Sequence, residues 1–188
     1  MMTRDQAFVL LQEHVETKRV LKHSLAVEAA MMAYARKFGE DEHYWGLVGL
    51  LHDIDFEKYP EEHPMKSPPI LEANGFDQTF IDTILSHGTA AQVPKDTNVR
   101  KALHAVDEMA SFIIAIALMR PNKLEGLKAK SVKKKMKDKA FTRAVNREEL
   151  VSSMEALGME FAEHVDIIVE GLKERESVLS NDGLSLLE

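Results

Sequence analysis

Residues 45–57 read WGLVGLLHDIDFE, so an apolar helix runs directly into an adjacent histidine and aspartate. An unpaired imidazole or carboxylate loses solvation in a dry interior, and His52 and Asp53 therefore need a binding partner there. Neighbouring residues of a helix diverge by about 100°, so these two side chains can converge only near a helix end. The polar run 55–58 and Pro60 supply that end.

The composition predicts one soluble domain with one core, because the chain has 188 residues and is 45% hydrophobic. It has no cysteine, which excludes disulfides and thiolate chemistry, and we expect a cytoplasmic protein. Residues 1–15 favour an amphipathic helix over a signal peptide. The longest apolar run, Met109–Met119, is shorter than the roughly 20 residues that cross a bilayer, so we expect no membrane partner.

The charge is unevenly distributed. The net charge is −7, yet residues 128–139 hold seven lysines and one aspartate, which leaves −13 for the remainder. Nucleic-acid binding favours a basic domain overall, so this pattern argues against it and favours a small phosphorylated ligand. Lys130, Lys133 and Lys134 are candidate substrate contacts, while a solvated helix face remains an alternative.

Helical periodicity dominates the chain, which predicts an all-α fold without strands. Start and stop signals predict helices over 3–15, 17–38, 41–53, 67–73, 77–87 and 97–119. Beyond Pro121 they predict a lysine-rich segment after Ser131 and then helices over 146–157 and 159–175. We expect a single domain over residues 1–175, in which helices from 121–175 pack on the first bundle. The tail 176–188 has little periodicity and is expected to fray.

Three further polar side chains lie on apolar helix faces, where core residues are expected. They are His23 beside Val20 and Val27, His87 behind Phe80 and Ile84, and Asp107 between Leu103 and Ala110. Each histidine alone is more often a hydrogen-bonded core residue than a ligand. Together with His52 and Asp53 they have one economical explanation, a shared divalent cation. Asp53 has two oxygens and can reach a second ion.

The ordered set His23, His52-Asp53 and Asp107 resembles the HD superfamily of metal-dependent phosphohydrolases, over roughly residues 18–120. This resemblance implies an HD-type helical bundle with additional C-terminal helices. His63 and His87 occupy the places of two more ligands in the two-metal branch of that superfamily. The resemblance implies one ion held by His23, His52, Asp53 and Asp107, and a second held by His63, His87 and the bridging Asp53. With a single ion, His63 and His87 would be substrate-facing or structural.

The sequence departs from the superfamily after the histidine-aspartate pair. The common His-Asp-Ile-Gly-Lys loop is here HDIDFEK, so Asp55 replaces the glycine and Lys58 is displaced. Lys58 is the candidate for the substrate-contacting lysine of that loop. The Gly-Tyr-Pro signature of the cyclic-dinucleotide branch is absent from the sequence. Residues 130–148 resemble a segment of HD hydrolases whose substrates are uncharacterised.

The resemblance implies hydrolysis of a small phosphorylated substrate, such as a nucleotide or phosphate ester, by a metal-activated hydroxide, with His52 and Asp53 at the catalytic centre. Phosphomonoesterase and phosphodiesterase activity both stay open. The number of divalent ions per chain, one or two, is also open. Their identity can be Fe, Mn, Zn, Ni or Mg, and a homo-oligomer is possible. Two other functions remain open: a diiron oxygenase with the same six ligands, and a non-catalytic metal- or nucleotide-binding module.

Four other histidines are given no role at the site. His104 lies one turn before Asp107, where a surface or core position is favoured over contact with substrate or the aspartate. The rest, His14, His43 and His164, have polar neighbours and no convergent partner.

Overall fold

The computed structural model describes residues 2–188, and this part of the chain is helical and contains no strand. The predicted all-α class is confirmed. The α-helices are α1 (Arg4–His14), α2 (Lys18–Phe38), α3 (Glu42–Leu51), α4 (Ser67–Ala73), α5 (Gln78–Leu85), α6 (Asn98–Leu118), α7 (Ala129–Met136), α8 (Arg147–Ala156) and α9 (Phe161–Leu179), followed by a 3-10 turn, η1 (Ser180–Asp182). Up to α8 their ends lie within about three residues of the predicted ones.

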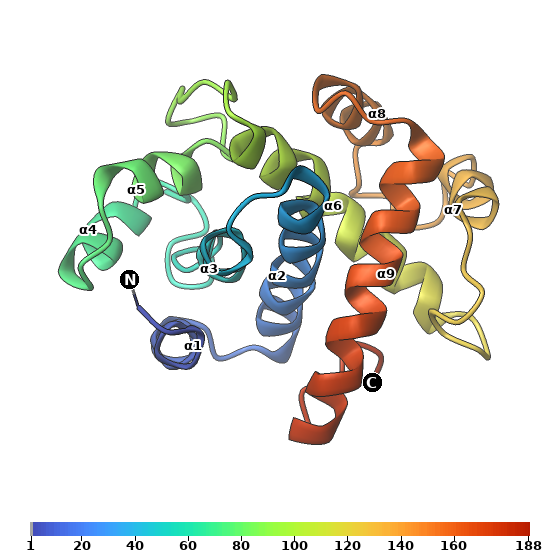
Figure 1. The fold of residues 1–188 in the computed structure, drawn as a ribbon, viewed down its shortest axis with the longest axis horizontal. Helices are drawn as coiled ribbons and strands as arrows, with labels where there is room; N and C mark the ends of the chain where they lie inside the picture. The colour runs from blue at the N-terminus through green and yellow to red at the C-terminus, as the bar shows by residue number, and fades with distance from the viewer. Residues whose placement is uncertain (1) are drawn as a thin grey trace.

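Helix α2 is the central element of the bundle. It packs against α3, α6 and α9, and Figure 1 shows it between α3 on one side and α9 on the other. Two glycines permit this close packing. A Cβ on Gly49 of α3 would lie 2.8 Å from the Val27 carbonyl oxygen, and one on Gly171 of α9 would lie 2.8 Å from the Ala29 carbonyl oxygen. Both partner helices therefore touch the α2 backbone itself.

Helix α2 also carries a buried charge. Glu28 is 1% exposed, and its carboxylate accepts hydrogen bonds from Arg4 of α1 at 2.8 and 3.1 Å and from Arg175 of α9 at 3.4 Å. A buried carboxylate needs such partners. The pairs connect α1, α2 and α9.

The C-terminal helices pack on the first bundle, with α9 against α2 and α8 against α6 (Figure 1). The prediction that 176–188 frays is wrong. Helix α9 continues to Leu179, and Leu186 is only 2% exposed. The Glu176 carboxylate accepts hydrogen bonds from the Ser185 hydroxyl and the Leu186 backbone N–H, at 2.5 and 2.7 Å. The buried Leu186 and these hydrogen bonds order the segment, although its sequence has no helical periodicity.

Helix α6 contains the longest apolar run and is a core helix, in which Phe112, Ile113 and Ala117 are fully buried. Within residues 2–188, no helix has the length and apolar character needed to span a bilayer.

Candidate metal centre

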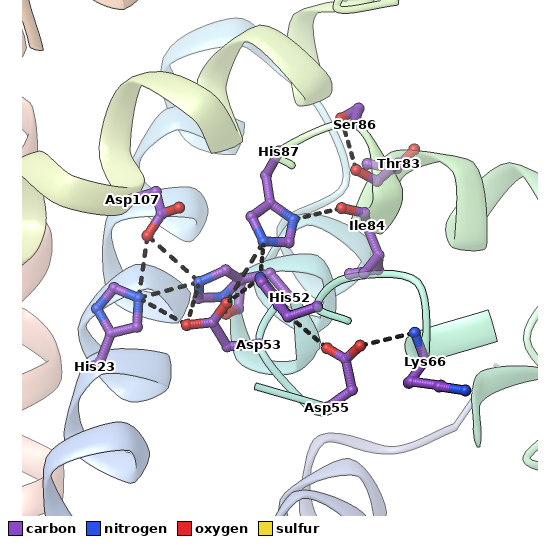
Figure 2. Close-up of polar contacts among 12 residues, drawn as sticks. His23, His52, Asp53, Asp55, Lys66, Thr83, Ile84, Ser86, His87 and Asp107 are labelled. Carbon is purple, nitrogen blue, oxygen red and sulfur yellow. Dashed lines mark hydrogen bonds and ion pairs between the residues drawn. The ribbon is translucent and has the colours of Figure 1, made fainter. Parts of the chain in front are cut away.

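Six side chains from five regions of the chain converge at one point of the bundle, and Figure 2 shows the arrangement. Helix α2 contributes His23 and α6 contributes Asp107. The other four lie just outside shorter helices: His52 and Asp53 after α3, His63 before α4, and His87 after α5. Helix α3 ends at Leu51, so the turn that follows lets the adjacent His52 and Asp53 point to the same place.

The first cluster consists of His23, His52 and Asp107. The His23 Nε2 atom lies 3.1 Å from His52 Nε2 and 3.0 Å from Asp107 Oδ1. One oxygen of Asp53, Oδ2, completes the group at 3.3 Å from His23 Nε2 and 3.4 Å from His52 Nε2. Four potential ligand atoms thus surround one point.

The second cluster consists of Asp53, His63 and His87. The Nε2 atoms of His63 and His87 are 2.9 Å apart. The other Asp53 oxygen, Oδ1, lies 3.3 Å from His63 Nε2 and 3.5 Å from His87 Nε2. Asp53 therefore presents one oxygen to each cluster, which is the geometry of a bridging carboxylate.

Hydrogen bonds on the far side of each ring orient the four histidines. The Nδ1 partners are the Ser111 hydroxyl for His23 (2.8 Å), the Gly49 carbonyl for His52 (2.8 Å), Asp55 Oδ1 for His63 (2.7 Å) and the Ile84 carbonyl for His87 (2.5 Å). A carbonyl or carboxylate oxygen can only accept, so Nδ1 carries the proton in the last three rings. Their neutral form then has a bare lone pair at Nε2.

The position of the proton on Nδ1 determines what the Nε2 atoms in the clusters can bind. In the His63–His87 pair, two lone pairs would face each other at 2.9 Å, and neither can donate a hydrogen bond to the other. A cation between the two nitrogens removes this repulsion, and imidazole nitrogen with carboxylate oxygen is a common donor set for divalent transition metals. Both clusters therefore fit a metal ion.

The electrostatics of the centre also favour positive charge. Burial lowers the pKa of His23, but its hydrogen bonds with Asp107 and Asp53 outweigh burial and raise it to about 9. Burial likewise opposes charge on His52, yet the charges of Asp53 and Asp107 raise its pKa well above the usual value. Burial raises the pKa of both carboxyl groups, but the charge of His52 and the hydrogen bonds from the histidines lower it overall. The two carboxylates thus attract positive charge to this point.

Asp55, which replaces the glycine of the common loop, supports the second cluster. It is fully buried, and one oxygen accepts the Nδ1–H of His63 while the other accepts the backbone N–H of Lys66 at 2.9 Å. Figure 2 shows this carboxylate between the centre and Lys66. A carboxylate behind a histidine fixes the ring and raises its basicity as a ligand.

A cavity of about 770 Å³ opens onto the centre. Five of the six converging side chains line it: His23, Asp53, His63, His87 and Asp107. Two basic residues of α2, Arg19 and Lys22, line it as well. Arg19 precedes His23 by four residues and so shares its helix face, which means that periodicity could have identified it. Lys22 directly precedes His23 and lies off that stripe, so periodicity gave no signal for it. Ser111 was detectable as the polar residue one turn beyond Asp107.

The predicted lysines lie elsewhere. On α7, the side chains of Lys130, Lys133 and Lys134 are exposed. Lys58 donates a hydrogen bond to the Glu13 carbonyl oxygen at 2.7 Å. Among the described residues, the cavity lining includes none of these four. The structure therefore gives no support for their predicted contact with substrate.

An all-α domain with two histidine–aspartate clusters that share one carboxylate is a candidate metalloprotein. The protein-family model of the HD domain matches residues 20–130, a range that contains all six converging residues, and the chain belongs to the HD domain family. HD domains are typically metal-dependent hydrolases. No curated protein and no solved structure matches the chain.

Proposed function

We propose that the protein is a metal-dependent phosphohydrolase that acts on a small phosphorylated molecule. The first ion would be held by His23, His52, Asp53 and Asp107, and the second by His63, His87 and the bridging Asp53. The observation that carries this proposal is the opposition of two imidazole Nε2 atoms in each cluster, with one Asp53 oxygen beside each pair.

Divalent ions bound in this way lower the pKa of water and neutralise charge on a phosphoryl group, which suits ester hydrolysis near neutral pH. The chain contributes rigid ligands. The hydrogen bonds at Nδ1 hold the rings in one orientation, so little reorganisation accompanies the reaction. Because the clusters share Asp53, a phosphoryl group bound at one cluster would lie beside the other.

The substrate class is supported by the cavity. Its volume of about 770 Å³ falls within the range of sites for small molecules. Arg19 and Lys22 offer cationic groups that an anionic ligand can contact, and the acidic Glu108 and Glu188 also line the cavity. The ligand residues line the same space, so a substrate there has direct access to the centre.

The test is phosphate release by metal-depleted protein reconstituted separately with Mn, Fe(II), Zn or Ni. A panel of phosphomonoesters and phosphodiesters is assayed without oxygen, and we expect turnover that depends on the added ion. Substitution of the exposed Asp166 on α9 by alanine serves as a control and should retain this turnover.

Two results would contradict the proposal. Oxygen consumption with Fe(II), without phosphate release under any condition, would indicate the oxygenase chemistry of the same ligand set. Tight binding of metal and phosphorylated ligands without turnover would indicate a binding module.

A further inference from the structure

The part of the cavity beyond the metal centre has an apolar wall. Along α6, the side chains that follow Asp107 and Ser111 on the same face are aliphatic. The wall that we call the apolar groove consists of Val20, Ile114, Ala115, Leu118 and Leu186. Helices α2 and α6 pack against each other, so the groove runs between them and is bounded by the C-terminal segment.

The groove is long compared with a phosphoryl group. Along α6, the cavity lining extends from Asp107 at the centre to Leu118 in the groove, a helix length of about 16 Å. Leu118 is 45% exposed although it is a large apolar residue, and it lines the cavity. A ligand in the groove would therefore remove apolar surface of Leu118 from water.

The chemistry of the groove argues against a strongly hydrophilic ligand body. Reading a sugar or a nucleobase requires several polar groups that converge on it. Ser111, which lies where the groove begins, already contacts the Nδ1 atom of His23. Beyond Ser111, the α6 wall offers aliphatic carbon, which favours the removal of apolar ligand surface from water.

The cavity is also complementary in charge to one anionic end. The cavity lining carries the basic Arg19 and Lys22 and the acidic Glu108 and Glu188, so the centre loaded with cations is the place that suits an anion. The apolar groove suits hydrocarbon or an aromatic ring. Lys22 is partly occupied by the Glu188 carbonyl oxygen at 2.5 Å, so the centre is the stronger site for the anionic group.

We propose that this cavity recognises an amphipathic phosphoester, with the phosphoryl group at the centre and an alkyl or aryl body in the apolar groove. This inference names the substrate class of the proposed function and rests on it for the position of the phosphoryl group. Leu118 and Ile114 act as specificity-determining residues.

The test measures binding and needs no turnover. Methyl-, butyl- and octylphosphonate, which are not hydrolysed, are titrated calorimetrically into the Mn-loaded protein. We expect the Kd to fall at least about tenfold from the butyl to the octyl compound, because four more CH₂ groups are buried. Octyltrimethylammonium has the chain without the anion and should bind at least about tenfold more weakly than octylphosphonate.

The matched variants are Leu118→Asn and Met119→Asn. Both residues are exposed apolar side chains at the end of α6, at 45% and 65%, but among the described residues only Leu118 lines the cavity. The octyl-to-butyl preference should shrink to within about threefold in Leu118→Asn and persist in Met119→Asn.

A wild-type protein with equal affinity for the butyl and octyl compounds, or with no affinity for any of them, would overturn the inference. So would a Leu118→Asn variant with the full wild-type preference. The proposed function fails separately: chain-length-dependent binding without phosphate release would contradict hydrolysis and leave the groove assignment standing. Phosphate release without chain-length preference would support hydrolysis and contradict the groove assignment.

Discussion

Two groups of histidine contacts both involve helices α2 and α6, and they differ in what satisfies the ring nitrogens. On α9, His164 is fully buried, its Nδ1 atom accepts a hydrogen bond from the Tyr34 hydroxyl, and its Nε2–H donates to the Ala105 carbonyl oxygen at 3.2 Å. Both ring nitrogens are thus satisfied by the protein. In the candidate metal centre, each Nδ1 has a protein partner, whereas each Nε2 atom faces another Nε2 and a carboxylate oxygen.

The difference also appears in the charge that each environment favours. Burial lowers the pKa of His164 to about 4, although the hydrogen bond to Ala105 opposes this shift. Burial acts in the same direction on His23, yet Asp107 and Asp53 raise its pKa to about 9. Burial alone therefore does not identify a ligand. The informative features are a second nitrogen that faces another imidazole nitrogen and carboxylates that attract positive charge.

The largest expected effect comes from Asp53→Ala, which removes the bridge between the clusters. We expect loss of metal from both clusters and a fall in phosphate release of at least about 100-fold. Metal content per chain, measured by mass spectrometry, and thermal unfolding with and without Mn check this, because bound metal raises the unfolding temperature. His164→Gln should keep its metal. A metal-replete Asp53→Ala protein would remove the distinction between the two groups.

The second effect tests the role of Asp55 behind His63. Asp55→Ala removes the acceptor of the His63 Nδ1–H, so we expect the second cluster to lose about 10–100-fold in metal affinity. The first cluster, which does not contact Asp55, is the internal control in the same titration. Equal weakening of both binding steps, or of neither, would contradict the assignment of Asp55 to one cluster.

The third comparison uses the two glycines that contact α2. Gly49→Ala and Gly171→Ala each place a Cβ about 2.8 Å from a carbonyl oxygen, and each should lower the free energy of unfolding by about 1–3 kcal/mol. Only Gly49→Ala moves α3 away from α2 where His52 meets His23, so only this variant should also lose metal affinity. Urea unfolding and metal titration separate the two effects. A similar metal affinity in both variants would refute this division.

The smallest effect concerns pH. Because the folded-state pKa of His164 is lowered, its stabilising contribution is present above the unfolded value of 6.5 and declines as pH falls from there towards 4. Between about pH 7.5 and about pH 5 the wild-type protein should lose about 2 kcal/mol more than His164→Gln. Urea unfolding with a chelator checks this, since the other histidines titrate equally in both proteins. Equal losses would show that His164 is not buried neutral.

Much of the fold was predictable because it depends on local signals. Asp41, Asp77 and Asn146 cap the helices that begin beside them, and Gly39 ends α2 with a positive φ of 70°. The C-terminal tail was not predictable in this way. Its order depends on burial of Leu186 and on bonds to Glu176, which are tertiary contacts without a periodic pattern.

The site divides along the same line. Polar residues on apolar stripes identified His23, His87 and Asp107 as residues that need partners, because helix geometry alone determines which face they occupy. His164 lies on the same kind of stripe, with Phe161 and Ile168, but periodicity cannot show that Tyr34 and Ala105 satisfy its ring, because these partners are distant in sequence. The lysine-rich segment was conspicuous in composition, but α7 places it away from the cavity lining.

By itself, the sequence determined the helices, their apolar faces and the presence of histidines and aspartates on those faces, since these follow from local periodicity and capping. Only the tertiary structure decided that Asp53 presents one oxygen to each cluster, that Asp55 supports His63, and that Arg19 rather than Lys130 lines the cavity. The physical reason is that distances between side chains of different helices depend on how closely those helices pack, which contacts such as that of Gly49 with α2 set.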